Sequence, residues 1–271
     1  WYLTGWASAA AEPRVIRTFE DIPREEAEAG FAFSWTANRF TVNLSAAYAN
    51  DPVDGEEFRP DDTYLGMVLG NWMVTAGWQQ RWWGPGNDAS SILSSNARPR
   101  PGVTLQRNLS TPFETKWLSW LGPWDLDVIW GFMEEDRVIP NARFFGMRFS
   151  FRPVPSLEIG LSRSAQWCGD GRPCGADTFW DLFLGKDNTG SDGNTPDTEP
   201  GNQLAGFDLR WSNTWFRQPS AIYLQGIAED EAGGFPSRYM ALIGIETSGY
   251  IRNRWSYRWY AEVAGRPSAK A

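Results

Sequence analysis

The sequence of 271 residues contains no histidine. Catalytic triads and dyads that use imidazole, and His-ligated metal sites, therefore cannot be built from it. Cysteine is nearly as scarce, because Cys168 and Cys174 are the two cysteines of the chain, within "WCGDGRPCG". Two thiols cannot complete a structural zinc site, whereas one disulfide can close a short Gly/Pro-rich loop. We therefore predict a Cys168–Cys174 disulfide in an oxidising compartment such as the periplasm or cell surface; two unpaired loop thiols are the alternative.

Long apolar runs and clustered cations are also missing. No stretch of about 18 apolar residues occurs, which excludes a transmembrane helix. The chain carries 25 Lys and Arg against 33 Asp and Glu, a net charge of -8, and phosphate binding needs clustered cations. We therefore expect no nucleic-acid partner. The opening "WYLTGWASAA" lacks the charged start and apolar core of a secretory signal, so we expect a mature or truncated chain.

Aromatic residues, by contrast, are abundant. They make up 15% of the chain, with 17 Trp, 16 Phe and 8 Tyr, although the mean hydropathy of -0.45 is polar. Two architectures reconcile these properties. One is a carbohydrate-handling β protein whose sugars stack on rings, and the other is an outer-membrane β-barrel with aromatic girdles.

Alternation of apolar and polar residues with period two is the dominant pattern. In "FTVNLSAAY" (40–48) Phe40, Val42 and Leu44 fall on one face, and "WDLDVIWGF" and "FFGMRFSFR" repeat the pattern. The polar face carries charges or glycine. About twelve candidate strands of roughly ten residues begin near residues 31, 40, 64, 73, 115, 124, 143, 157, 204, 220, 238 and 254. One stretch, 20–30, reads as helical or as an acidic surface loop.

The connections between these strands alternate in length. Short ones are expected at 70–71, 122–124, 152–156 and 217–220, and long ones at 50–62, 84–113, 167–203 and, more briefly, 229–237. Short turns on one rim and long loops on the other are typical of outer-membrane barrels. We therefore predict an all-β fold, an antiparallel up-and-down transmembrane β-barrel, as one domain over 1–271 that is incomplete at one or both ends. A soluble β-sandwich or propeller is the alternative.

The segment 81–102, "RWWGPGNDASSILSSNARPRPG", is the least strand-like part of the chain. We expect a strand to end near Trp83, after which Gly84, Pro85 and Gly86 turn the backbone. Prolines hold Arg98 and Arg100 in an extended backbone, and arginine donors suit carboxylates such as those of uronic acids. The candidate polysaccharide-binding residues are Asn96, Arg98, Arg100, Arg107, Trp82 and Trp83.

Each of these candidates has a structural alternative. Arg98, Arg100 and Arg107 can pair with acidic residues that line a barrel, and Trp82 and Trp83 can belong to the aromatic girdle at the end of a membrane strand. Whether the segment binds polysaccharide or closes the lumen depends on which way it points.

The chain resembles the Wzi-like capsule assembly family. The resemblance rests on "RWWGPG" (81–86), "SSILSSNARPRPGVTLQR" (90–107), "WLSWLGPW" (117–124), "LEIGLSR" (157–163), "LGKDN" (184–188) and "PGNQLAGFDLRW" (200–211). It implies an outer-membrane barrel of about eighteen strands, a periplasmic helical region that this sequence does not show, and a surface lectin for group 1 type capsular polysaccharide. The implied partners are acidic capsular polysaccharide, outer-membrane lipid and other capsule export components.

Two acidic stretches are candidate catalytic or metal sites. Glu134, Glu135 and Asp136 are consecutive, but a glycosidase needs two facing carboxyl groups, so a solvated rim is the preferred interpretation. The oxygen-rich stretch 187–202 lacks the EF-hand order, so an exposed loop is preferred to a calcium site. We expect no catalytic residue, metal or cofactor. The leading hypothesis is a non-enzymatic lectin; the alternatives are a transport barrel gated by 81–107 and a soluble polysaccharide-active enzyme.

Overall fold

The computed structural model describes residues 1–13, 25–52, 54–184, 201–215, 217–232, 235–252 and 254–265. Within these ranges it contains strands, one α-helix and one short 3-10 helix, η1. Their bounds are β1 (Tyr2–Ala9), β2 (Ala27–Ala37), β3 (Phe40–Asn50), β4 (Phe58–Arg59), β5 (Tyr64–Leu69), β6 (Trp72–Trp78), β7 (Pro101–Arg107), η1 (Ser119–Leu121), β8 (Trp124–Phe132), β9 (Arg143–Val154), β10 (Leu157–Trp167), α1 (Ala176–Phe183), β11 (Gly201–Trp215), β12 (Gln218–Ala232), β13 (Phe235–Ile251) and β14 (Trp255–Gly265).

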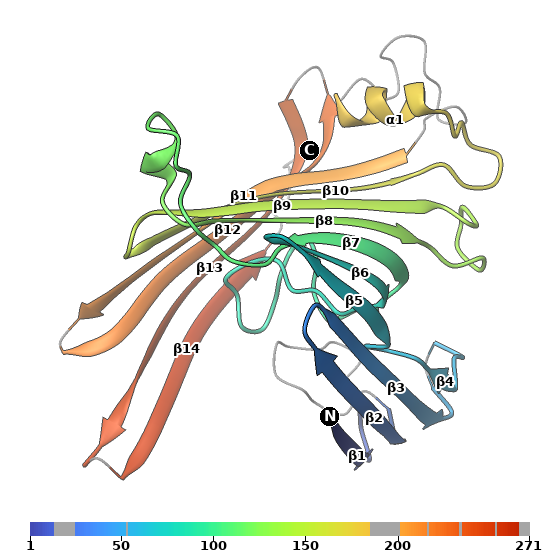
Figure 1. Cartoon of the computed structure of the whole chain (residues 1–271), viewed down its shortest axis with the longest axis horizontal. Helices are drawn as coiled ribbons and strands as arrows, with labels where there is room; N and C mark the ends of the chain where they lie inside the picture. Colours follow the sequence, from blue (N-terminus) through green and yellow to red (C-terminus); the bar gives the residue numbers. More distant parts are fainter. Residues whose placement is uncertain are drawn as a thin grey trace.

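All strands belong to one 14-stranded antiparallel sheet in which neighbours in sequence are neighbours in space, with the short β4 off the path on β3. Figure 1 shows this sheet curled into a wall. The strands β1 and β14 are its two edges, and among the described residues they do not pair with each other. The all-β, up-and-down prediction is confirmed. Within the described ranges, no helix is long and apolar enough to cross a membrane.

The two faces of the sheet differ because antiparallel pairing puts alternate side chains on opposite faces. On β11, Phe207 is 47% exposed, whereas the next residue, Asp208, is buried. Phe207 pairs with Leu161 on one side and with Gly226 on the other, so the apolar residues continue across strands. We call the face that carries Phe207 the outer face and the face that carries Asp208 the inner face. An exposed apolar outer face behind a polar inner face is the pattern of a membrane barrel.

The strand count differs from the prediction of about twelve. The strand expected near residue 115 is wrong, and β1, β4 and β7 were not expected. Around 115, the apolar residues Trp117, Leu118, Trp120 and Leu121 have a spacing of three and four rather than two, and they form the turn that contains η1. Strand β7 lies within the predicted long loop 84–113: its start is rich in Pro and Gly, which favours a loop, although its Val103 and Leu105 alternate with Thr104.

Short turns lie at one end of the strands, which we call the short-turn rim. The turns at Asn38, Gly70, Arg217 and Arg252 each contain a residue with positive φ, as tight hairpin turns require. The exception is the connection 108–123 between β7 and β8, so the predicted short turn at 122–124 is wrong.

Long connections lie at the opposite end, the long-loop rim: 51–63, 79–100, 133–142, and the connection after β10 that contains α1. The loop expected at 229–237 is wrong in length, because β12 runs to Ala232 and β13 begins at Phe235. The stretch 20–30 is not helical at its described end, since residues 27–30 belong to β2. The calcium alternative for 187–202 falls almost wholly outside the described residues.

Candidate functional site: the inward-folded segment and the inner wall

After β6 the chain leaves the sheet and crosses the inner face as the segment 79–100. The backbone N–H of Trp83 donates to the carbonyl of Leu93 at 2.9 Å. The carbonyl of Trp83 accepts a hydrogen bond of 2.8 Å from the amide of Gln225, which lies on β12. Gly84 has φ +146, and a Cβ there would meet the Gln225 amide. The segment therefore points into the concavity of the sheet.

Trp83 fixes the start of the segment on the inner face of β8 and β9. Its side chain is 3% exposed, and its indole N–H donates to the Asp127 carboxylate at 3.1 Å. Arg81 lies 3.6 Å from the same carboxylate. The ring covers Gly146 on β9, where an added Cβ would lie 2.9 Å from it.

The interpretation of Trp82 and Trp83 as girdle residues at a strand end is thus wrong. Strand β6 ends at Trp78, and Gly77, with φ +141, takes the backbone out of the sheet. Trp82 is half-buried, and its indole N–H donates to the carbonyl of Gly86 at 3.0 Å. Both tryptophans therefore stabilise the segment itself.

The middle of the segment is anchored on the far strands of the wall. The backbone N–H groups of Asn87 and Asp88 both donate to the Glu262 carboxylate, the second at 2.9 Å. Tyr223 donates to Glu262 at 2.7 Å and accepts from the Asn87 amide at 3.0 Å. Arg258 donates to the amide oxygen of Asn87. The contacts of Asn87 and Asp88 join residues more than 130 positions apart in the sequence, so the segment spans from β6 to β12–β14.

The predicted arginines Arg98 and Arg100 are engaged by carboxylates of the long-loop rim. Arg98 is 8% exposed; it donates to Asp61 at 2.9 Å and to Asp54 at 3.3 Å. Partial burial raises the pKa of Asp54, but the backbone N–H of Glu56 and the nearby Arg59 and Arg98 outweigh it and lower this pKa below the ordinary value.

Arg100 is likewise paired with a carboxylate at this rim. Arg100 forms an ion pair with Glu134, which also holds Arg137 at 3.1 Å. Arg98 and Arg100 therefore pair with acidic residues, which was the structural alternative to direct polysaccharide binding. Asn96 lies at the exposed part of the segment, with its backbone N–H on Ser94 at 3.2 Å.

Arg107 lies apart from the other candidates, at the opposite end of β7. Its guanidinium stacks 3.6 Å over the ring of Trp124 on the outer face and donates to the carbonyl of Leu109 at 2.9 Å. The structure thus brings Trp82, Trp83, Asn96, Arg98 and Arg100 together in one segment and separates Arg107 from them.

A polar pocket of about 300 Å³ lies in the inner wall below this anchorage, on β11–β14. Glu246 forms ion pairs with Arg210 and with Arg258, the latter at 3.1 Å. The amide of Asn87 also donates to Glu246, at 3.3 Å. The inner-face residues Ser212, Thr214, Pro219 and Ser248 complete the lining, and three of them carry hydroxyl groups. The pocket also borders Asn213, Ser220 and Thr247, whose register puts their side chains on the outer face.

This pocket was not among the predicted sites. The alternation had assigned Arg210 and Arg258 to the polar faces of their strands, but the partner Glu246 lies 36 residues from Arg210, and sequence alone does not give that register. Cation and hydroxyl donors around a pocket of this size suit a carboxylated, hydroxyl-rich ligand.

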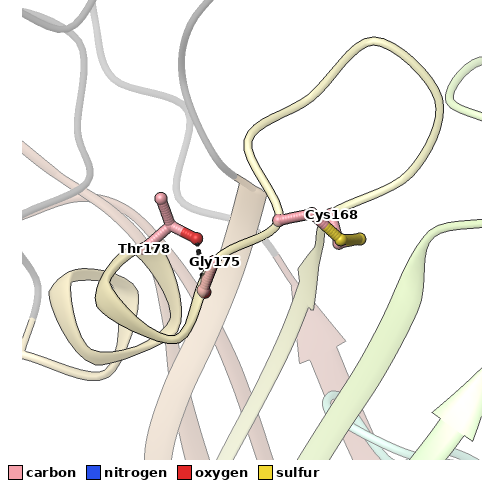
Figure 2. Close-up of a disulfide and its surroundings, with 4 residues drawn as sticks. Cys168, Gly175 and Thr178 are labelled. Carbon is pink, nitrogen blue, oxygen red and sulfur yellow. Dashed lines mark hydrogen bonds between the residues drawn. A yellow bond between two sulfur atoms is a disulfide. The ribbon is translucent and has the colours of Figure 1, made fainter.

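Cys168 and Cys174 form the predicted disulfide, at the long-loop rim beside the start of α1 (Figure 2). Gly175 is the N-cap of this helix, and the Thr178 hydroxyl donates to the Gly175 carbonyl at 2.7 Å. The disulfide therefore closes a small loop directly before the helix.

An apolar outer face, a polar inner face and a segment folded against that inner face define the wall of a membrane β-barrel. The family model of the capsule assembly protein Wzi matches residues 5–265. The chain belongs to this family.

Two known proteins are similar over nearly the whole chain. A 55.8 kDa protein of the cps region of Klebsiella pneumoniae, described as uncharacterized, is 35% identical over 265 residues. The solved structure of Wzi from Escherichia coli, described as an outer-membrane protein involved in group 1 capsule assembly and a carbohydrate-binding β-barrel, is 31% identical with a TM-score of 0.78. Each match covers 96% of this chain, but 51% of the first protein and 54% of the second. The chain thus spans about half the length of these relatives.

Proposed function

We propose that this chain forms part of the wall of an outer-membrane β-barrel that binds acidic capsular polysaccharide and assists capsule assembly without enzymatic activity. The observation that carries the proposal is the inner-wall pocket, where Arg210 and Arg258 share Glu246 among hydroxyl side chains. A uronate carboxylate competes with Glu246 for either guanidinium, and the sugar hydroxyls replace water on the Ser and Thr side chains.

The segment 79–100 contributes to the proposed site in two ways. Arg98, held by Asp61, and Arg100, held by Glu134, position the segment rather than contact the sugar directly. Asn96, on the exposed part of the segment, is the original candidate best placed to meet polysaccharide that arrives at the long-loop rim. Lipid around the outer face and other capsule export components remain the proposed partners.

Binding of the detergent-purified chain to an acidic polysaccharide, with a neutral polysaccharide beside it, tests the proposal. We expect Arg258→Ala and Arg210→Ala each to weaken binding of the acidic polymer by about 10-fold, the loss of one charged hydrogen bond of about 1.5 kcal/mol. Arg39→Ala, an exposed arginine in the turn between β2 and β3, is the matched control and leaves binding unchanged. Equal binding by all three variants would remove the pocket from the site.

A second candidate function is favoured by the anchorage of the segment. Because 79–100 is held on both sides of the concavity, by Asp127 and by Glu262, it constricts the lumen, as a gate of a transport barrel would. Single-channel conductance separates this function from a lectin. Deletion of 85–97 is expected to raise the current of a transport barrel, and an absence of current in both forms contradicts transport.

The soluble enzyme is the weakest of the three functions. Its outer face would have to expose large apolar side chains such as Phe207, Trp211 and Ile243 to water, which soluble proteins avoid over wide surfaces. Recovery of the chain from the soluble fraction without detergent would favour the soluble enzyme.

A further inference from the structure

Helix α1 lies against the outer face of the wall at the long-loop rim. The ring of Phe179 is 5.5 Å from that of Trp130 on β8, 5.4 Å from Phe145 on β9 and 5.2 Å from Trp167 on β10. All three partners belong to the outer face by their register. Figure 1 shows the helix outside the strands β8 to β11. It therefore covers a part of the surface that would otherwise meet lipid.

Helix α1 covers the outer face of β10 near the long-loop rim but not further along the strand. On β10, Ala165 and Trp167 are 2% and 3% exposed, whereas Leu161, on the same face further along the strand, is 49% exposed. Arg163, between them on the outer face, donates to the carbonyl of Leu182 at 2.7 Å and to that of Phe183. A cation at the carbonyl end of a helix stabilises it, so the wall itself holds α1 in place.

The exposed side of α1 is apolar along one row. Trp180 and Leu184, one turn apart, are 57% and 62% exposed, beside the exposed carboxylates Asp177 and Asp181. Exposed Trp and Leu side chains at the rim of an apolar wall are typical of an element at a membrane–water interface. Trp is particularly suited to that depth because its ring is apolar and its N–H is polar.

The connection 108–123 repeats this arrangement at the short-turn rim, over the same strands. Phe113 stacks on Trp124 of β8 at 4.5 Å, and Trp120 contacts Phe151 of β9 edge-on at 6.2 Å. Trp117 and Trp120 are 73% and 63% exposed. Their exposure, like that of Trp180, is left unexplained by packing within the described part of the chain.

We propose that α1 and the connection 108–123 are two interfacial anchors, which insert Trp180 and Leu184 into the outer-leaflet boundary and Trp117 and Trp120 into the periplasmic one. The supporting contacts on β9, Phe145 and Phe151, are six residues apart, roughly 20 Å along a strand. For a strand tilted by about 40° this is about 15 Å along the membrane normal, so both contacts lie inside an apolar band about 25 Å tall and the two anchors lie towards its opposite edges. The apolar outer face between them is continuous with both elements. The inference rests on the outer-membrane location proposed above.

A single cysteine label tests this directly, because both natural cysteines are held in the disulfide. Leu184→Cys, Trp180→Cys and Trp120→Cys are each labelled with bimane in the full chain, reconstituted in phosphatidylcholine vesicles. Nitroxide quenchers are placed either on the lipid headgroup or at mid-chain. We expect the headgroup nitroxide to quench all three labels at least twofold more than it quenches a label at Asn96→Cys, in the exposed part of the inner segment.

Phe207→Cys, on the outer face, is the positive control and is quenched best by the mid-chain nitroxide. Quenching at Phe207 with none above the Asn96 level at 180, 184 and 120 would overturn the anchors and leave the membrane location intact. An absence of lipid quenching at Phe207 as well would overturn the membrane location together with the anchors. Because Leu184 and Trp180 share one exposed row, misfolding of one variant does not remove the test.

Discussion

The buried indole of Trp83 donates its N–H to the Asp127 carboxylate across 3.1 Å, joining the inward-folded segment to the inner face of β8. Among the described residues, Arg81 is the cation that forms an ion pair with this carboxylate, at 3.6 Å. The pair therefore secures the position at which the chain enters the concavity. Removing this hydrogen bond is expected to loosen the inward-folded segment before it destabilises the sheet.

Trp83→Phe keeps most of the buried ring but removes the hydrogen bond. We expect it to lower the free energy of unfolding by about 1–3 kcal/mol, because a buried carboxylate loses a donor. Urea unfolding in detergent measures the change, and a double-mutant cycle with Asp127→Ala, which removes the acceptor, isolates the pair. Additive effects of the two substitutions would show that the contact contributes nothing of its own.

Gly146→Ala tests whether the Trp83 ring really covers the inner face. The added Cβ would lie 2.9 Å from that ring, so we expect a cost of about 1–3 kcal/mol from overpacking. Gly131→Ala on β8, where the Cβ would meet its neighbours at 3.5 Å, is the matched control. If the two alanine variants unfold at the same urea concentration, the ring does not occupy this position.

Glu262→Gln weakens the anchorage of Asn87 and Asp88 on β14. A carboxylate accepts stronger hydrogen bonds from backbone N–H groups than a neutral amide does, so the segment becomes more mobile. We expect faster proteolytic cleavage within 85–97, in detergent, by several-fold. Glu158→Gln, whose carboxylate pairs with the exposed Arg152, serves as the control and leaves the cleavage rate unchanged.

The ion pairs of Arg98 give the segment a defined pH dependence. The pKa of Asp54 is lowered, so the stabilisation it provides is complete above its unfolded value of about 3.9 and is lost as the pH falls through the lower folded pKa. We therefore expect constant protection of the segment from proteolysis between about pH 5 and 8. Loss of protection near pH 6 would contradict the assignment, as would unchanged protection in Asp54→Asn at neutral pH.

Reduction of the Cys168–Cys174 disulfide is expected to act locally. The loop it closes has a sequence separation of 6, and short loops contribute least to chain entropy, about 2 kcal/mol here. Cys168→Ser with Cys174→Ser should therefore speed proteolysis near α1 without unfolding the wall. Hydrogen exchange resolves the two regions; a loss of protection in β11–β14 would show a wider role.

Alternation predicted the class of fold because each face of the sheet meets a different solvent. The strands around Phe40, Trp124 and Phe207 follow directly from it. Strand β7 was not predicted because it begins with Pro and Gly, which usually indicate a loop. The glycine is required by the close pairing of β7 with β8, because a Cβ on Gly102 would lie 2.7 Å from the Trp130 carbonyl. A pattern read from neighbouring residues in the sequence does not predict that contact.

The site was less predictable than the fold for a related reason. The sequence singled out the segment with Trp83, Asn96 and Arg98, and its proline-stiffened arginines. Its direction depends on Glu262, which lies 174 residues from Asp88. The pocket depends in the same way on which inner-face residues of β11, β13 and β14 stand side by side. Such registers are set by the whole sheet rather than by any motif.

Cross-linking between Asp88→Cys and Tyr260→Cys in the full chain, with a short thiol-specific reagent in outer-membrane preparations, tests the inward fold of the segment. The two side chains are in contact at 2.8 Å, and the pair leaves the Glu262 carboxylate and its backbone donors intact. Ser220→Cys with Thr247→Cys, which are paired across β12 and β13, reports that the sheet has formed. We expect efficient cross-linking of both pairs. Cross-linking of 220 to 247 without cross-linking of 88 to 260 would contradict an inward-folded segment held on the far wall.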